Sequence, residues 1–291
     1  MSSISAGCDH TSSCGEGTSG SEEQPLAKEL QTSVNIIEIK GEFIDGGVTG
    51  LVERLGSGDV IKSPWTGRPE ALDCRREMAI EALVYQRLGT HPRLVRMKHW
   101  DPVDHTLTLE YMAHGNLKNY IRKHGQKISP AQRTQWVMEA AESLELLHSH
   151  GVIQSDVGPR NFLLDIDLSL KICDFGGSSL DGSEATVAPG VRYRLPGLAE
   201  RHIQQATIKE DLFGLGSTIY FIVNGYEPYD DLEDEDQVER LYMGGVFPEL
   251  GGVPFADIIK LCWQQEAESA KMIIELIRGL SAEECSRDNP K

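Results

Sequence analysis

The sequence predicts an α+β protein with two lobes, a small antiparallel β lobe that contains one helix and a larger, mainly α-helical lobe. Two observations indicate this class. Short runs of strand type, such as "GLVERL" at 50–55 and "TLTLEYM" at 106–112, dominate the region before Gly115. Longer segments with helical periodicity follow it. A length of 291 residues suffices for two lobes that share a cleft, where small-molecule sites commonly lie.

Composition and charge exclude several classes of protein. Hydrophobic residues make up 40 %, which is typical of a globular chain. The formal net charge of −17 opposes binding to nucleic acid and to anionic membranes, so we expect neither as a partner. The six cysteines are scattered without CxxC pairs, which favours a reduced, cytoplasmic or nuclear setting. The N-terminus lacks the basic start and apolar region of a secretory signal.

The composition shifts along the chain and predicts three regions. Residues 1–34 are rich in Ser, Gly, Thr and Glu, and we expect a disordered tail because such a segment buries little apolar area. Residues 35–278 form the folded domain, with a small lobe at about 35–112 and a large lobe at about 113–278. Residues 279–291 are predicted to be a C-terminal tail.

The small lobe is predicted to hold five strands and one helix. "VNIIEI" (34–39), "GLVERL" and "DVIK" (59–62) are the first strands, and a helix follows at about 70–88. "HPRLVRM" (91–97) and "TLTLEYM" are the last two strands.

The large lobe begins with the helix "NLKNYIRKHG" (116–125). A second helix opens at Ser129, its N-cap, with Pro130 in the first turn. The following elements are a hairpin of "FLLDI" (162–166) and "LKICDFG" (170–176), a loop at 177–196, and helices at 211–223, near 235–243, and two across 254–278.

Three polar residues around the hairpin have a distinctive spacing. Asp156 and Asn161 lie five positions apart in "QSDVGPRN" (154–161), and Asp174 follows in "DFG", thirteen residues after Asn161. In this order and spacing they resemble the catalytic loop and DFG motif of the eukaryotic protein kinase family. The resemblance covers roughly residues 40–278, and it includes "LCW" (261–263) near the end.

The resemblance implies an ATP-dependent protein kinase with Mg²⁺ as cofactor. Asp156 would accept or orient the proton of the substrate hydroxyl, and Asn161 and Asp174 would bind Mg²⁺. A hairpin brings Asn161 and Asp174 together at its open end, as a magnesium site with oxygen ligands requires. Asp211 would brace the backbone of the catalytic loop. We expect a monomer that acts on a protein substrate.

The nucleotide-binding motifs of the family also have counterparts. "DGGVTGLV" (45–52) resembles the Gly-rich loop through Gly47, Gly50 and Val52, although Asp45 replaces the first glycine. The lysine that binds phosphates would be Lys62, held by Glu81, with Glu77 as the rival partner one turn earlier. The resemblance implies main-chain contacts to adenine from residues after the gatekeeper Leu109, namely Glu110 and Met112.

The catalytic loop departs from the family pattern at three positions. Gln154 and Ser155 replace His-Arg, and because the arginine normally pairs with an activation-loop phosphate, we expect activity that does not need that phosphate. Gly158 replaces the lysine typical of serine/threonine kinases. Arg160 matches the arginine of tyrosine kinases, and it would help place the substrate hydroxyl or the γ-phosphate. The choice between Ser/Thr and Tyr stays open.

A second departure follows the loop. In "RYRLPG" (192–197), Gly197 replaces the glutamate of the Ala-Pro-Glu motif, and "CWQQEAESAKMI" lacks the arginine that pairs with it. Loss of both partners of a buried ion pair is nearly neutral, so we expect an altered detail of the fold. Two alternatives to an active protein kinase remain. They are a nucleotide-binding pseudokinase scaffold and a small-molecule phosphotransferase of the aminoglycoside-kinase type.

Overall fold

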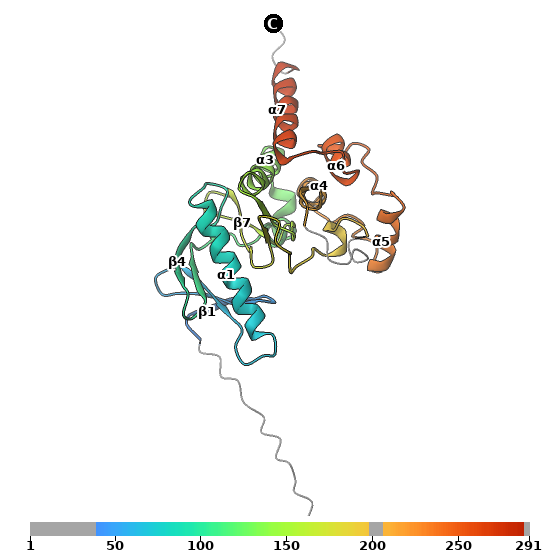
Figure 1. Ribbon diagram of the computed structural model, residues 1–291. Coiled ribbons are helices and arrows are strands. Elements are labelled where there is room, and N and C mark those ends of the chain that lie inside the picture. The colour runs from blue at the N-terminus through green and yellow to red at the C-terminus, as the bar shows by residue number, and fades with distance from the viewer. Residues whose placement is uncertain (1–38, 198–205, 288–291) are drawn as a thin grey trace, which may run out of the picture. The chain divides into compact units, whose positions relative to one another are not determined.

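The computed structural model describes residues 39–197 and 206–287. Its first part is an antiparallel five-stranded sheet with the strand order β1-β2-β3-β5-β4. The strands are β1 (Glu42–Gly46), β2 (Gly50–Arg54), β3 (Val60–Pro64), β4 (Met97–Asp101) and β5 (Thr106–Leu109). Helix α1 (Ala71–Leu88) lies against this sheet (Figure 1). The predicted small β lobe with one helix is confirmed.

Helix α1 presents one face to the protein interior. Met78, Glu81, Ala82 and Tyr85 are buried, and their spacing of three and four residues places them on one side of a helix. Glu81 is the only charged residue in this buried set. The packing of the apolar neighbours therefore fixes where the Glu81 carboxylate lies.

One predicted strand differs from the structure, and another lies largely outside the described residues. Of the strand predicted at 34–39 only Ile39 is described, and the first described strand is β1, whose last two residues, Asp45 and Gly46, begin the segment that resembles the Gly-rich loop. All five residues of β1 are exposed, so it lacks the alternating pattern that reveals a strand in sequence. In the segment predicted as a strand at 91–97, Leu94 forms a single bridge to Ile172, and β4 begins only at Met97.

The second part of the described chain is mainly helical. It contains α2 (Leu117–His124), α3 (Pro130–Ser149), α4 (Ile208–Asn224), α5 (Glu235–Met243), α6 (Ala256–Trp263) and α7 (Ala270–Arg287). Helix α4 is buried almost throughout and packs against α3 and α6, while α7 packs against α3 (Figure 1). Ser129 caps α3 as predicted, because its side chain accepts a hydrogen bond from the Gln132 N–H at 3.1 Å. Helix α7 continues to Arg287, past the tail boundary predicted at 278.

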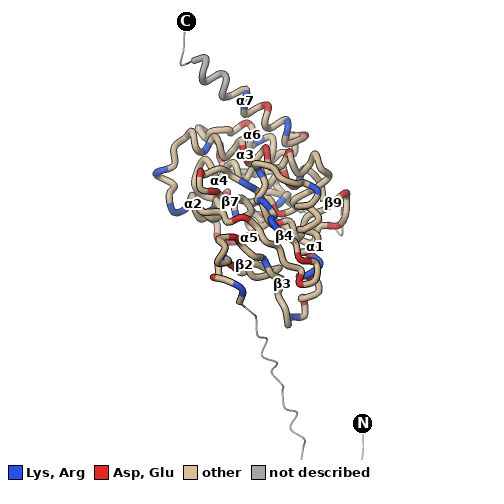
Figure 2. The backbone as a smooth tube through the Cα atoms, turned by 90° about the vertical axis from the view of Figure 1, so that its left-hand side faces the viewer, with Lys and Arg blue, Asp and Glu red and all other residues tan. Residues whose placement is uncertain are grey.

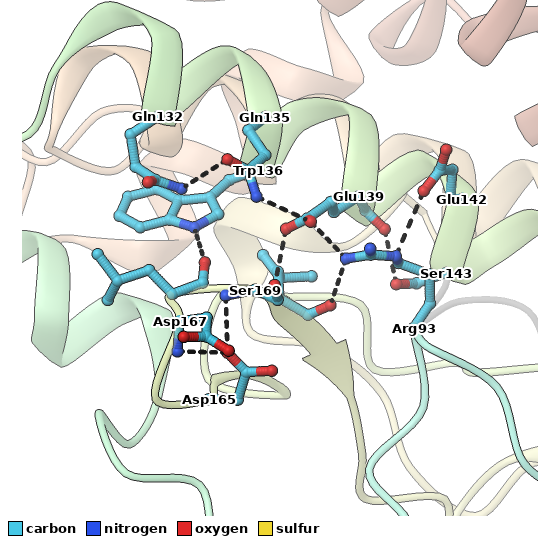
Figure 3. Close-up of polar contacts among 12 residues, drawn as sticks. Arg93, Gln132, Gln135, Trp136, Glu139, Glu142, Ser143, Asp165, Asp167 and Ser169 are labelled. Carbon is cyan, nitrogen blue, oxygen red and sulfur yellow. Dashed lines mark hydrogen bonds and ion pairs between the residues drawn. The ribbon is translucent and has the colours of Figure 1, made fainter.

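A hairpin of β7 (Phe162–Leu164) and β8 (Leu170–Ile172) carries two of the predicted site residues at its ends. Helix α3 anchors this hairpin through two side chains (Figure 3). The Trp136 indole N–H donates to the Leu168 carbonyl at 2.8 Å, and the buried Glu139 carboxylate accepts from the Leu170 N–H at 2.8 Å. Both bonds end on backbone atoms of the hairpin. They therefore hold the hairpin in place without depending on the hairpin's own side chains.

Arg93 completes this anchor from the segment before β4. Its guanidinium lies 2.5 Å from the Glu139 carboxylate and 3.3 Å from that of Glu142, and it also donates to the Leu170 carbonyl at 3.1 Å (Figure 3). A buried carboxylate needs such a partner, since an unpaired buried charge is strongly unfavourable. Arg93 thus joins α3 and the hairpin to the segment between α1 and β4 in the first part of the fold.

The loop predicted at 177–196 contains two short elements. Strand β9 (Ser179–Leu180) pairs with β6 (Val152–Ile153), and a 3-10 turn, η2, spans Val191–Tyr193.

Acidic residues gather at the start of α5, where they complement the helix dipole (Figure 2). Among the helices described, none combines the length and the apolar character that crossing a membrane requires.

Candidate active site

Lys62, Glu81 and Asp174 meet where the sheet, α1 and the hairpin converge. The Lys62 Nζ atom lies 2.6 Å from Glu81 Oε2 and 2.5 Å from Asp174 Oδ1. Burial lowers the pKa of Lys62, but the charges and hydrogen bonds of Asp174 and Glu81 outweigh it and hold the pKa above its ordinary value. Lys62 is therefore a cation, held by one buried carboxylate and one half-exposed one.

Glu77, the rival partner of Lys62, has a different role. Its carboxylate accepts hydrogen bonds from the hydroxyl of Thr49 at 2.8 Å and from that of Thr186 at 3.2 Å. Thr49 lies in the turn between β1 and β2, and Thr186 lies in the segment after the DFG motif. Glu77 thus links these two segments to α1, and the choice of Glu81 as the partner of Lys62 agrees with the geometry.

Asp156 and Asn161 lie within hydrogen-bond distance of each other. The Asn161 Nδ2 group donates to the Asp156 carboxylate at 2.9 Å and to the Asp156 carbonyl at 2.8 Å. Burial raises the pKa of Asp156 to about 6, although the hydrogen bond from Asn161 opposes the rise. At neutral pH Asp156 is thus a carboxylate with a pKa suited to accepting a proton from a hydroxyl group.

Asp211 of α4 holds the backbone of the catalytic loop, as predicted. Its carboxylate accepts from the N–H groups of Gln154 at 2.8 Å and Ser155 at 2.9 Å, and it lies 2.9 Å from His148 Nε2. Ser155 has a φ of +63°, an uncommon conformation for a residue with a side chain. The Asp211 hydrogen bonds support this strained backbone immediately before Asp156.

Gln154 replaces a histidine of the family pattern and bonds to the residues of the DFG region. Its side-chain amide donates to the carbonyl of Asp174 at 2.8 Å and to that of Cys173 at 3.2 Å. The Cys173 N–H in turn donates to the Asn161 carbonyl at 3.0 Å. These bonds bring Asn161 and Asp174 to the same end of the hairpin, as the sequence predicts.

The turn between β1 and β2 contains the predicted phosphate-binding glycines. The Gly47 N–H donates to the Gly50 carbonyl at 3.0 Å. A Cβ atom at Gly50 would lie 2.0 Å from the Ser63 carbonyl oxygen, so only glycine fits there. Val52 is directly opposite Lys62 in the sheet, and cross-strand partners share a face. The two residues therefore stand on the same side of the sheet.

The connector after β5 carries Glu110 and Met112. The Glu110 N–H donates to the Arg96 carbonyl at 3.0 Å, and its carboxylate pairs with Lys171 at 2.7 Å. Met112 is buried, and its carbonyl accepts from Gly115 N–H at 3.1 Å. The side chain of Glu110 thus binds Lys171 of the hairpin. Main-chain groups would make the predicted contacts to adenine.

Arg160 and the catalytic loop border a pocket of about 300 Å³, whose other wall comes from residues 189–193. A buried ion pair between Lys118 and Glu227, 2.7 Å apart, also lines it. The Lys118 N–H donates to the Pro159 carbonyl at 3.0 Å, which ties α2 to the loop. This pair was not predicted from the sequence, because residues 109 positions apart leave no local signal.

A different ion pair stands beside Gly197. Arg194 pairs with Glu239 of α5, and the Gly197 N–H donates to the same carboxylate at 3.4 Å. The glutamate and arginine that the family uses are absent, yet this segment is tied to α5 instead. The end of this segment is thus held to α5 through Glu239.

The donor set fits a magnesium ion. Asn161 gives its Nδ2 group to Asp156, which leaves its Oδ1 atom as the available ligand. The Asp174 side chain is 49 % exposed and uses only Oδ1 toward Lys62. Two protein oxygens completed by phosphate and water oxygens are the usual environment of Mg²⁺.

Comparison with protein families decides the classification. The family described as "Protein kinase domain" matches residues 66–287, more than half of the chain. The chain belongs to the protein kinase family. The two-lobed kinase fold predicted from the sequence is confirmed by this match and by the architecture above.

Several kinases are similar to this chain. "Cytoplasmic tyrosine-protein kinase BMX" of Homo sapiens is 28 % identical over 269 residues, which cover 84 % of this chain and 38 % of BMX. "Receptor-interacting serine/threonine-protein kinase 1" of Homo sapiens is 24 % identical, over 81 % of this chain and 40 % of its own length. "Serine/threonine-protein kinase ATG1b" of Arabidopsis thaliana is 30 % identical over 53 % of this chain and 22 % of ATG1b. The chain thus spans well under half the length of these relatives.

Proposed function

We propose that this chain is an active, ATP-dependent protein kinase that transfers the γ-phosphate to a hydroxyl group of a protein. The observation that carries the proposal is the contact of Lys62 with both Glu81 and Asp174. A cation held between α1 and the DFG aspartate is the arrangement that phosphoryl transfer in kinases requires. A kinase site that had lost its activity during evolution would lack one of these groups, whereas all three are present and in contact here.

Each of these residues has its own role in phosphoryl transfer. Lys62 neutralises phosphate charge, and Glu81 keeps its ammonium group in place. Asn161 and Asp174 would hold Mg²⁺, which when bound neutralises further phosphate charge. Asp156 accepts the proton of the acceptor hydroxyl, and Asn161 orients the Asp156 carboxylate through its hydrogen bond. Transfer is mostly positioning and charge neutralisation, so these contacts account for it.

The test is transfer of labelled phosphate from ATP to a mixture of denatured proteins. We expect transfer by the wild-type chain and a loss of about a thousandfold in both Asp156→Asn and Asp174→Ala, given the usual contributions of base and charge stabilisation. Glu249→Gln, an exposed substitution, is the control. Transfer that persists unchanged in Asp174→Ala would contradict the proposal.

A second candidate is a nucleotide-binding pseudokinase that serves as a scaffold. Ser155 and Gly197, which replace an arginine and a glutamate of the family pattern, favour it. In that case ATP with Mg²⁺ would raise the melting temperature, because a ligand that binds only the folded state stabilises it. No acceptor would be phosphorylated under the same conditions.

The names of the relatives do not choose the acceptor residue. BMX is named a tyrosine kinase, whereas the other two are named serine/threonine kinases. The acceptor must therefore be inferred from the site itself.

A further inference from the structure

The pocket beside Asp156 lies between the catalytic loop and residues 189–193. Its volume is about 300 Å³, and it is open to solvent on one side. Asp156 and Asn161 line it, so a group bound in this pocket meets the side chain that accepts the proton. The shape of this pocket therefore bears directly on which hydroxyl group is phosphorylated.

Two glycines on opposite walls keep the pocket wide. A Cβ atom at Gly190 would meet nothing within 4 Å, and one at Gly158 would meet only the Tyr193 ring, at 3.8 Å. Neither glycine has a positive φ, so the backbone does not require glycine at either position. What these two glycines contribute to the site is the space that a side chain would otherwise take.

Part of the wall of this space is apolar, and six charged residues line the rest of the pocket. Pro159, Pro189, Val191 and Tyr193 line it, and all four are buried. Rings of Tyr or Phe gain much of their binding energy from contact with such surfaces. A serine or threonine side chain has no ring and fills less of this space, and an unfilled apolar space loses the contacts that would hold the acceptor in place.

Arg160 is one of three cations that line the pocket, with Lys118 and Arg192. It is exposed, lines the pocket with Asp156, and has no hydrogen-bond or ion-pair partner among residues 39–197 and 206–287. By contrast, Lys118 lies 2.7 Å from Glu227 and Arg192 lies 3.6 Å from Glu235, and all four residues line the same pocket. Among the described cations that line the pocket, Arg160 is thus the one that remains to stabilise negative charge on an acceptor oxygen.

We propose that the acceptor is the phenol of a tyrosine residue, bound between Gly158 and Gly190. This inference rests on the proposed function. The Asp156 carboxylate takes the phenolic proton as the phenol oxygen forms a bond to the γ-phosphorus. The bond between that phosphorus and the β,γ-bridging oxygen breaks, and ADP leaves with the bonding electrons. Arg160 stabilises the charge that develops on the phenol oxygen.

The experiment uses three peptides that differ only in the acceptor, Tyr, Ser or Thr, with labelled ATP and Mg²⁺. For the wild-type chain we expect transfer to the Tyr peptide at least about tenfold above the other two, the scale on which pockets discriminate by size. Gly190→Val and Gly158→Leu fill the pocket, so both should lose transfer to the Tyr peptide by about tenfold or more.

Gly251→Val is the matched control, because Gly251 is exposed, has no positive φ, and has open space around it. It should transfer phosphate to the Tyr peptide as the wild type does. The shift in melting temperature caused by ATP and Mg²⁺ verifies that each variant is folded and binds nucleotide. Transfer mainly to Ser or Thr would overturn this inference and leave the proposed function intact. Absence of transfer to all three peptides and to the mixed proteins would overturn both.

Discussion

The side-chain amide of Gln154 donates a hydrogen bond to the carbonyl oxygen of Asp174, with 2.8 Å between the two atoms. This bond joins the catalytic loop to the DFG motif through a residue that departs from the family pattern. The neighbouring Cys173 carbonyl accepts from the same amide at 3.2 Å. Gln154, which departs from the family pattern, therefore maintains the position of Asp174, the proposed magnesium ligand.

We predict that Gln154→Leu impairs transfer while Gln154→His preserves most of it. Leucine has a similar volume but leaves two carbonyl groups without their donor, which costs about 1–3 kcal/mol where these groups are buried. An imidazole N–H can replace one of the two donors. The measurement is kcat and KM for ATP, together with the free energy of unfolding in urea.

If Gln154 served only to stabilise the fold, Gln154→Leu would lower the free energy of unfolding and leave kcat unchanged. A positioning role also lowers kcat in Gln154→Leu, at temperatures where the variant is fully folded, and histidine restores it. Equal kcat values for Gln154→Leu and the wild type would contradict the positioning role of Gln154.

Lys62 leads to a second prediction, about stability as well as activity. Lys62→Met leaves the Glu81 carboxylate, which is 1 % exposed, without its ammonium partner. Breaking a buried ion pair on one side costs about 3–5 kcal/mol, whereas removing both partners is often nearly neutral. The double variant Lys62→Met/Glu81→Leu should thus be more stable than Lys62→Met, although neither transfers phosphate.

Urea unfolding of the wild type, both single variants and the double variant checks this prediction as a double-mutant cycle. Thr186→Val, which removes a hydrogen bond to Glu77 on the same helix, is the control for effects on α1 in general. If the double variant were the least stable of the set, the Lys62–Glu81 pair would not be the source of the destabilisation.

The sequence predicted most helices from their periodicity, and it predicted the central site through the resemblance to the protein kinase family. The bounds of α5, 235–243, were predicted as they are observed, and the resemblance named Glu81 as the partner of Lys62, which it contacts at 2.6 Å. The positions of Asp156, Asn161 and Asp174 follow from a hairpin whose strands show clear apolar runs. Features of this kind can be predicted from the sequence alone.

Other features depend on contacts between distant residues. Strand β1 is exposed along its length and is ordered by pairing with β2, so its residues carry no strand pattern. The Lys118–Glu227 and Arg194–Glu239 pairs join segments far apart in the chain. The two hydrogen bonds of Gln154 to the DFG region could likewise only be seen in the folded structure.

The anchor of the hairpin gives a third prediction. Arg93→Ala removes the guanidinium that lies 2.5 Å from the Glu139 carboxylate, and the Glu139 side chain is only 6 % exposed. We expect the free energy of unfolding to fall by about 3 kcal/mol, the cost of an uncompensated buried charge. Arg278→Ala is the matched control, because Arg278 is 65 % exposed and lies 3.9 Å from Glu142. It should change the free energy of unfolding by less than about 0.5 kcal/mol. Similar losses in the two variants, measured by urea unfolding, would show that the Arg93 contact is not a buried anchor.

The last prediction concerns pH and the Glu227 carboxylate. Burial alone would raise the pKa of Glu227, but the hydrogen bond and charge of Lys118, together with Arg122, outweigh it and hold the pKa below its ordinary value. A group whose pKa is lowered by folding stabilises the protein above its unfolded pKa, near 4.5, and this contribution is lost as pH falls through the lower folded value.

Glu227→Gln removes that charge, so it should lower the free energy of unfolding at pH 7 by about 2 kcal/mol, within the range for hydrogen bonds to charged groups. The difference from the wild type should shrink as the pH is lowered below about 4, because the wild-type carboxylate then becomes protonated and resembles the amide. Urea unfolding at several pH values measures the difference, with exposed Glu249→Gln as the control that should show little change at any of them. A Glu227→Gln difference that grows toward low pH would have the wrong sign, and it would mean that Lys118 does not stabilise the ionised form of Glu227.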